Sequence, residues 1–70
     1  MEYEDLLSFK ENFRLSNIAM FHLELLLDSN NVNLYDIDKI KYNPLNDKFE
    51  FYGSQENIMF VIQRTLLERL

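Results

Sequence analysis

The sequence predicts an α+β fold with the element order α-β-β-α, and three observations support this prediction. Residues 2–28 contain no Pro or Gly and carry apolar residues at three- and four-residue spacing, which is typical of a long helix. Residues 39–52 alternate apolar and polar side chains on either side of a turn, which is typical of one antiparallel β-hairpin. Residues 54–70 return to helical spacing after the only glycine, Gly53. We expect these elements to form a single small domain over residues 1–70.

The predicted N-terminal helix carries two apolar stripes. The stripe that should face the core consists of Leu6, Phe9, Phe13, Met20, Leu23 and Leu27, and the second consists of Leu7, Ile18, Phe21 and Leu25. Residues 18–27 are apolar on nearly every side, and such a helix needs cover from more than one direction. We expect one continuous helix, and the alternative is a break at Ser16, which could cap a second helix.

The segment after this helix predicts a helix end and a connector. Short polar side chains at residues 28–31 compete for the backbone, and Asn adopts a left-handed cap readily. Leu34, Tyr35 and Ile37 follow closely, and we expect all three to anchor the connector to the core.

The hairpin is the clearest local signal in the chain. Asn43 can accept a hydrogen bond from the turn backbone, Pro44 presets φ, and Asp47 tolerates the left-handed conformation that the turn requires. The resulting register predicts an apolar face and a polar face, with the opposed pairs Tyr42–Phe49, Ile40–Phe51, Lys41–Glu50 and Lys39–Tyr52.

The predicted C-terminal helix begins with Ser54 as N-cap and runs to Leu70. Its core side should consist of Ile58, Met59, Ile62, Leu66 and Leu70. Phe60 and Leu67, seven residues apart, should project together away from that side, and Arg64 can pair with Glu68 one turn later.

Composition argues against most kinds of active site and metal site. There is no Cys, and the one His, His22, cannot build a zinc site, which needs about four ligands. We expect His22 to be a structural side chain, and Asp36 and Asp38 to be ordinary loop residues. A single glycine also leaves no Gly-rich phosphate loop. We therefore expect no catalytic residue, metal or cofactor, and no enzymatic activity.

The formal net charge is −5, which argues against nucleic acid or an anionic membrane as the main partner. Acidic residues gather near the N-terminus, where they suit a helix dipole and also predict a surface for a larger protein partner: Glu2, Glu4, Asp5 and Glu11. An acidic start is unlike a signal peptide, and the ten apolar residues 18–27 are too few to span a bilayer, which takes about 20. We expect a cytoplasmic protein.

Self-association is the remaining expectation from composition. Hydrophobic residues make up 47% of the chain, more than so small an interior readily buries. We therefore expect a homodimer, with contacts through Phe60 and Leu67 and through Phe21 and Leu25 on the far side of the first helix.

Together these observations predict a small acidic protein–protein interaction module, dimeric and non-enzymatic, that acts as a regulator, inhibitor or assembly adaptor of a larger protein. Eight Asn residues beside one Ala and one Gly indicate an AT-rich genome, such as that of a phage or another mobile element. The alternative is a nucleic-acid-binding regulator that uses the hairpin lysines Lys39, Lys41 and Lys48.

Overall fold

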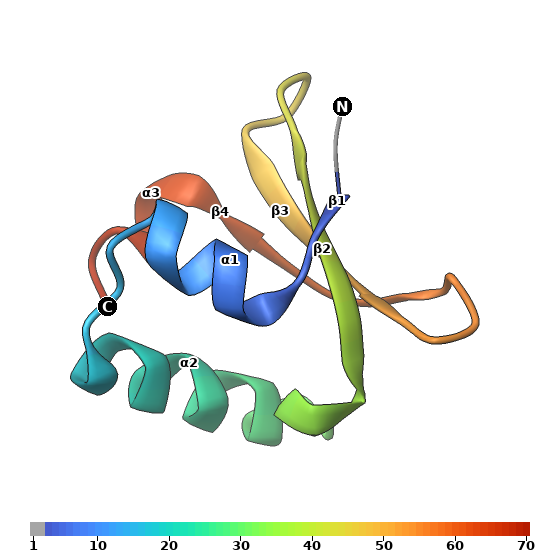
Figure 1. Ribbon diagram of the computed structural model, residues 1–70, viewed down its shortest axis with the longest axis horizontal. Coiled ribbons are helices and arrows are strands. Elements are labelled where there is room, and N and C mark those ends of the chain that lie inside the picture. The colour runs from blue at the N-terminus through green and yellow to red at the C-terminus, as the bar shows by residue number, and fades with distance from the viewer. Residues whose placement is uncertain (1–2) are drawn as a thin grey trace.

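The computed structural model describes residues 3–70 and shows an α+β protein, as predicted (Figure 1). One antiparallel sheet has the strand order β1-β2-β3-β4. In chain order the elements are β1 (Tyr3–Glu4), α1 (Leu6–Asn12), α2 (Asn17–Ser29), a 3₁₀ turn (Leu34–Asp36), β2 (Ile37–Asn43), β3 (Lys48–Gly53), β4 (Ile58–Gln63) and α3 (Arg64–Leu67). Because β1 is only two residues long, the other three strands make up most of the sheet.

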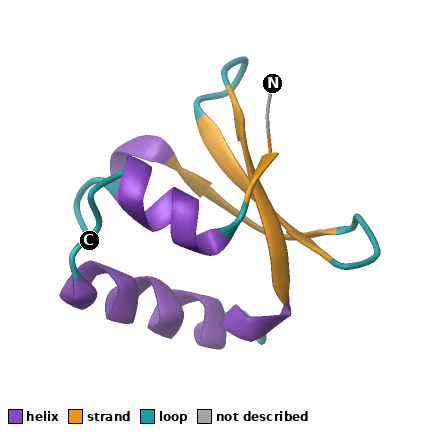
Figure 2. Cartoon of the chain, viewed as in Figure 1, coloured by secondary structure: helices purple, strands orange, loops and turns teal. Residues whose placement is uncertain are grey.

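The helices lie together on one face of the sheet, so the molecule has two layers (Figure 2). Successive side chains of a strand point to opposite faces. Ile40, Phe49 and Phe51 therefore point into the space between the layers, where they are buried. Their neighbours along each strand point to the opposite face, which no helix of the described chain covers.

The prediction of one long helix over residues 2–28 is wrong, and the alternative break at Ser16 is confirmed. The carboxylate of Asp5 caps α1 by accepting the Ser8 N–H at 2.8 Å, and the Ser16 hydroxyl caps α2 by accepting the Ala19 N–H at 3.0 Å. Between the helices Arg14 has a φ of 52°, which turns the chain. A good N-cap and one left-handed residue thus end a helical pattern that contains no Pro or Gly.

The end of α2 is as predicted. Asn31 has a φ of 61° and donates its N–H to Asp28 O at 3.0 Å, while the Val32 N–H bonds Leu27 O at 2.9 Å. These two bonds are those of a Schellman cap, and both apolar members, Leu27 and Val32, are buried.

The connector is only partly as predicted. Leu34 and Ile37 pack against the core, but Tyr35 is exposed. The cause is local: the Asn33 side chain accepts the Tyr35 N–H at 2.9 Å and starts the 3₁₀ turn, which directs Tyr35 outwards.

The predicted hairpin is confirmed in its turn and its register. Asn43 Oδ1 accepts the Leu45 N–H at 3.0 Å, and Asp47 has a φ of 57°. The opposed residues are the predicted ones, Lys39–Tyr52, Ile40–Phe51, Lys41–Glu50 and Tyr42–Phe49.

The predicted helix over residues 54–70 is wrong for most of its length. Residues 58–63 form β4, which pairs with β3, and only Arg64–Leu67 is an α-helix. The run Ile-Met-Phe-Val-Ile-Gln is rich in β-branched and aromatic residues, which favour a strand. The β3–β4 ladder has a bulge at Met59. Phe51 pairs with Phe60 and the next residue, Tyr52, pairs with Ile58, so Met59 has no opposite residue.

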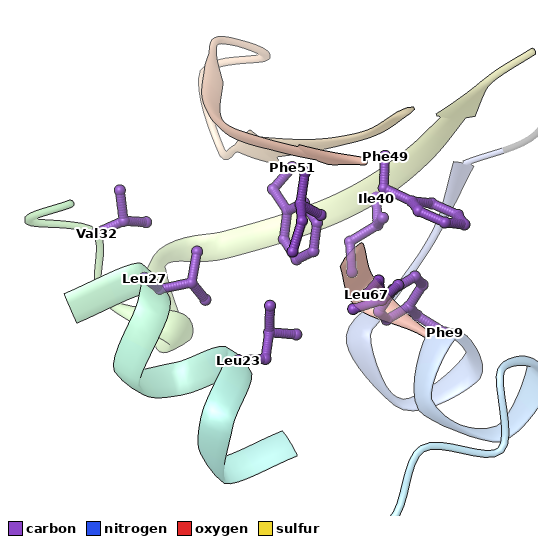
Figure 3. Close-up of a cluster of buried hydrophobic side chains, with 9 residues drawn as sticks. Phe9, Leu23, Leu27, Val32, Ile40, Phe49, Phe51 and Leu67 are labelled. Carbon is purple, nitrogen blue, oxygen red and sulfur yellow. The ribbon is translucent and has the colours of Figure 1, made fainter. Parts of the chain in front are cut away.

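One cluster of apolar side chains forms the core between sheet and helices (Figure 3). Phe9 of α1 lies against Phe49 and Phe51 in edge-to-face contacts, with ring centroids 5.3 and 5.7 Å apart, and each such pair contributes about 0.5–1.5 kcal/mol beyond burial. The other buried members are Leu23, Leu27, Val32, Ile40, Ile62 and Leu67. The predicted core stripe of residues 6–27 is thus confirmed, since its remaining members Leu6, Phe13 and Met20 pack against this cluster.

Candidate functional site

The two faces of α2 differ in burial but not in polarity. Ala19, Leu23 and Leu27 face the sheet and are buried. On the opposite face, Ile18, Phe21 and Leu25 are 69%, 57% and 47% exposed. We call these three residues the α2 stripe. Residues spaced three and four apart adjoin on a helix surface, so the stripe is one continuous apolar ridge.

The predicted structural role of His22 is wrong, because this side chain is exposed beside the α2 stripe. Its ring centroid lies 6.4 Å from that of Phe21. The position explains why no buried partner holds it: residue 22 follows Phe21 on the outward side of α2, away from the core residue Leu23.

Opposite charges lie at the two ends of α2. Arg14 and Lys10 precede the helix, where Lys10 Nζ donates to Asn17 Oδ1 at 2.7 Å. Glu24 and Asp28 lie in its second half, and its first turn carries no acidic side chain. The helix dipole has the same direction, positive at the N-terminus and negative at the C-terminus.

The structure separates the residues predicted for self-association. Phe21 and Leu25 lie together on the α2 stripe, as the second apolar stripe of the sequence indicates. Leu67 is only 1% exposed and belongs to the core, so its predicted surface role is wrong. Phe60 is half-buried on β4 with its ring edge-on to Phe51 at 5.7 Å. These two residues do not share a helix face, because residues 58–63 form a strand.

The residues predicted to bind a larger partner are only partly described. Glu2 lies outside the described residues, and Glu4 is placed only as part of the β1 backbone. Asp5 is exposed, and the Ser8 N–H that it accepts lowers the pKa of its carboxyl group. Glu11 is exposed on α1. Partner binding by this group stays a prediction.

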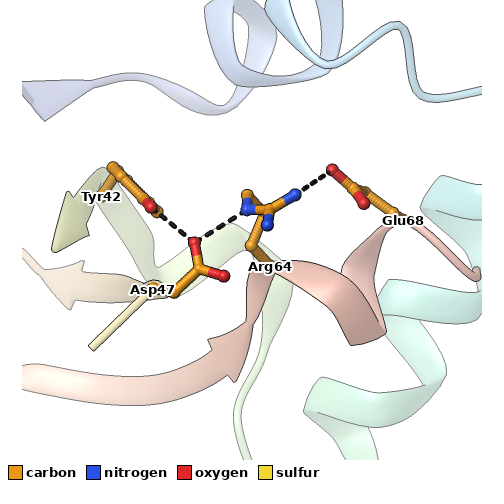
Figure 4. Close-up of polar contacts among 4 residues, drawn as sticks. All are labelled: Tyr42, Asp47, Arg64 and Glu68. Atoms are coloured by element: carbon orange, nitrogen blue, oxygen red, sulfur yellow. Dashed lines mark hydrogen bonds and ion pairs between the residues drawn. The ribbon is translucent and has the colours of Figure 1, made fainter. Parts of the chain in front are cut away.

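A polar network that the sequence does not predict joins the β2–β3 turn to α3 (Figure 4). Asp47 Oδ1 accepts the Tyr42 hydroxyl at 2.5 Å and Arg64 Nε at 2.7 Å, and Arg64 Nη1 bonds Glu68 Oε1 at 2.7 Å. The guanidinium lowers the pKa of Asp47, and the carboxylate raises the pKa of Tyr42. Arg64 and Glu68 pair as expected, but the Asp47 contact depends on β4, which brings Arg64 beside the turn. We call this network of Tyr42, Asp47, Arg64 and Glu68 the Arg64 clamp, because it connects the β2–β3 turn to α3.

Side chains that bind metal ions do not cluster in the described part of the chain. No group of three or more His, Cys, Asp or Glu side chains among the described residues could hold a metal ion. A polar cavity of about 380 Å³ lies between the 3₁₀ turn and the β3–β4 turn, lined in part by Asp36, Asp38 and Asn57. Two loop carboxylates there do not make a site by themselves, so the α2 stripe is the candidate site.

Within residues 3–70, none of the helices has the length and apolar character needed to cross a membrane. Comparisons with protein-family models, with curated proteins and with solved structures give no significant match.

Proposed function

We propose that the protein is a small acidic, non-enzymatic protein–protein interaction module that dimerises through the α2 stripe. The observation that carries the proposal is the exposure of Ile18, Phe21 and Leu25 on a helix whose other face already fills the core. A contiguous exposed ridge of large apolar side chains marks an interaction surface more often than scattered ones do.

The proposed partner is a second copy of the chain, and the arrangement of charge supports it. In an antiparallel pair with its two-fold axis between Phe21 and His22, Ile18 of each copy meets Leu25 of the other. The same axis brings Arg14 of each copy near Asp28 of the other, so opposite charges and opposite helix-dipole ends adjoin. A two-fold interface uses the same patch twice, which this self-complementary stripe permits.

The size of the α2 stripe determines the affinity that we expect for the dimer. A helix of 13 residues is about 20 Å long, which gives an interface at the small end of the stable range. We therefore expect a dimer that forms at micromolar concentration and dissociates on dilution. In the proposed function the dimer binds a larger protein as a regulator, inhibitor or assembly adaptor.

Light scattering across a dilution series tests the dimer. The wild-type protein should approach twice the mass of one chain at high concentration, and the variant Phe21→Gln/Leu25→Gln should stay at the mass of one chain. Gln keeps good helix propensity at both positions. Leu7→Gln is the matched control, because Leu7 is exposed on α1 and lies off the stripe. A folded wild-type protein that stays monomeric at every concentration would exclude the proposed dimer.

A further inference from the structure

The face of the sheet opposite the helices carries polar and apolar side chains in a regular arrangement. The register of β2, β3 and β4 places nine side chains on it in three rows, Lys39–Tyr52–Ile58, Lys41–Glu50–Val61 and Asn43–Lys48–Gln63. We call these nine residues the open face. Because the core residues of the same strands alternate with them, the open face lies on the side of the sheet away from α2.

The open face changes character across the three strands. β2 carries Lys39 and Lys41, and the edge strand β4 carries Ile58 and Val61, which are both exposed. On the middle strand Glu50 is held in place, since Tyr52 Oη donates to its Oε1 at 2.9 Å and Asn43 Nδ2 to its Oε2 at 3.3 Å. One side of the face is therefore cationic and the other is aliphatic.

The charge of the open face has the opposite sign to the net charge of the whole chain. Three lysines stand there against Glu50, and Glu56 lies next to the face, 3.4 Å from Lys39 Nζ. Among the side chains that the structure describes, the local balance is positive by one charge, in a chain whose formal net charge is −5. The face is thus complementary to an acidic partner, whereas two copies of the open face would repel each other.

We propose that the open face binds an acidic amphipathic helix of a partner protein. Three strands at about 4.8 Å spacing make a strip about 10 Å wide, which matches the width of one helix. The apolar stripe of such a helix contacts Ile58, Val61 and the Tyr52 ring, and its acidic flank lies over Lys39 and Lys41. Nucleic acid fits less well, because a phosphate backbone would make no favourable contact with the exposed aliphatic side chains of β4.

This proposal is independent of the α2 dimer, because the two surfaces lie on opposite sides of the molecule. A dimer formed through α2 would leave both open faces outward, and a monomer would still carry one. The failure of either proposal therefore leaves the other testable.

The probe is a synthetic amphipathic peptide of about 15 residues, with leucines on one face and glutamates along one flank. Its binding to the wild-type protein is measured by fluorescence anisotropy, and the contact surface is mapped by amide chemical-shift changes. We expect shifts in β2, β3 and β4, and weaker binding when the peptide glutamates are replaced by glutamines.

Two protein variants and one control test the residues of the open face. Lys39→Gln/Lys41→Gln should weaken binding about tenfold, since each exposed ion pair contributes a factor of about two to five. Val61→Thr keeps the β-branched shape and should weaken binding severalfold by removing apolar contact. Lys10→Gln/Arg69→Gln removes the same charge elsewhere and should leave the affinity close to that of the wild type.

Three results would overturn the proposal. The first is no binding of the peptide, and the second is a chemical-shift footprint confined to the α2 stripe. The third is tighter binding of single-stranded oligo(dT) that is insensitive to Val61→Thr, which would assign the face to nucleic acid instead.

Discussion

The two hairpin turns of the sheet share one backbone feature, a left-handed acidic residue, but are held by different means. Each has an acidic residue in the left-handed region, Asp47 with a φ of 57° in the first turn and Glu56 with a φ of 60° in the second. In the first turn, side chains secure that residue: Tyr42 and Arg64 both donate to Asp47, and the Arg64 N–H also bonds Asp47 O at 3.0 Å.

The second turn is held by backbone hydrogen bonds and has a residue without a side chain, Gly53, at its start. Gly53 N–H bonds Asn57 O at 2.9 Å, and Glu56 N–H bonds Gly53 O at 3.0 Å, as in a three-residue hairpin loop with one left-handed residue. The Glu56 side chain is 80% exposed and has a long ion pair with Lys39 at 3.4 Å. The comparison predicts that the left-handed acidic residue is needed in the first turn, where side chains hold it, and can be replaced in the second.

The largest expected effect is that of Gly53→Ala. An added Cβ would lie 2.7 Å from Met59 Sδ and 2.9 Å from Asn57 Oδ1, so both side chains must move. Both atoms lie near the ends of flexible side chains that can partly relieve the overlap, so we expect a loss of about 1–2 kcal/mol in the free energy of unfolding. Urea denaturation measures it, and an unchanged midpoint would show that the second turn has room that the structure does not indicate.

A pair of substitutions at Asp47 separates the clamp of the first turn from its backbone conformation. Asp47→Gly removes the carboxylate but still favours the left-handed conformation. Asp47→Ala removes the carboxylate and also disfavours that conformation. We expect both variants to be destabilised, and Asp47→Ala by about 1 kcal/mol more than Asp47→Gly. Thermal unfolding measures both, with Glu68→Gln as a control that shortens the network at its outer end. Equal stability of Asp47→Gly and the wild type would mean that the clamp contributes nothing.

The clamp also predicts a dependence of stability on pH. The Arg64 guanidinium, with help from the Tyr42 hydroxyl, lowers the pKa of Asp47 in the folded state. A carboxyl group with a depressed folded pKa stabilises the protein above its unfolded pKa, which is about 3.9, and loses that contribution as pH falls through the folded value. Asp47→Asn should therefore unfold at a lower temperature than the wild type at neutral pH, and the difference should shrink in acid. A difference that stays constant with pH would contradict this origin.

How well the sequence predicts each hairpin follows from the same contrast. In the first turn Asn43, Pro44 and Asp47 are residues with known turn roles, so turn and register are both predicted correctly. The second turn has Glu56 at the left-handed position, where glycine is the usual signal, and the strand after it has apolar residues four apart. That spacing fits a helix, so β4 is missed, and the Arg64 clamp and the open face are missed with it.

The α2 stripe is predicted better than the open face for a related reason. Phe21 and Leu25 belong to a local helical pattern, so their shared face can be predicted without knowledge of the fold. Val61 joins Lys41 and Glu50 only through strand pairing, which the sequence does not reveal once β4 is taken for a helix. The break at Ser16 lies between these cases, because its N-cap signal is local but competes with an unbroken apolar pattern.

The smallest expected effect is a gain in stability, from Glu56→Gly. A residue other than Gly, Asn or Asp pays a conformational penalty of about 1 kcal/mol in the left-handed region, and glycine removes it. The substitution also loses the exposed Lys39 ion pair, which contributes at most about 1 kcal/mol and less at 3.4 Å. We expect a net gain of about 0.5 kcal/mol, seen as a rise of about 2–4 °C in the unfolding temperature. Glu56→Gln is the control, since it removes the ion pair but keeps the backbone strain and should not raise the unfolding temperature. A loss of stability in Glu56→Gly would mean that the Lys39 contact holds the second turn as the Arg64 clamp holds the first.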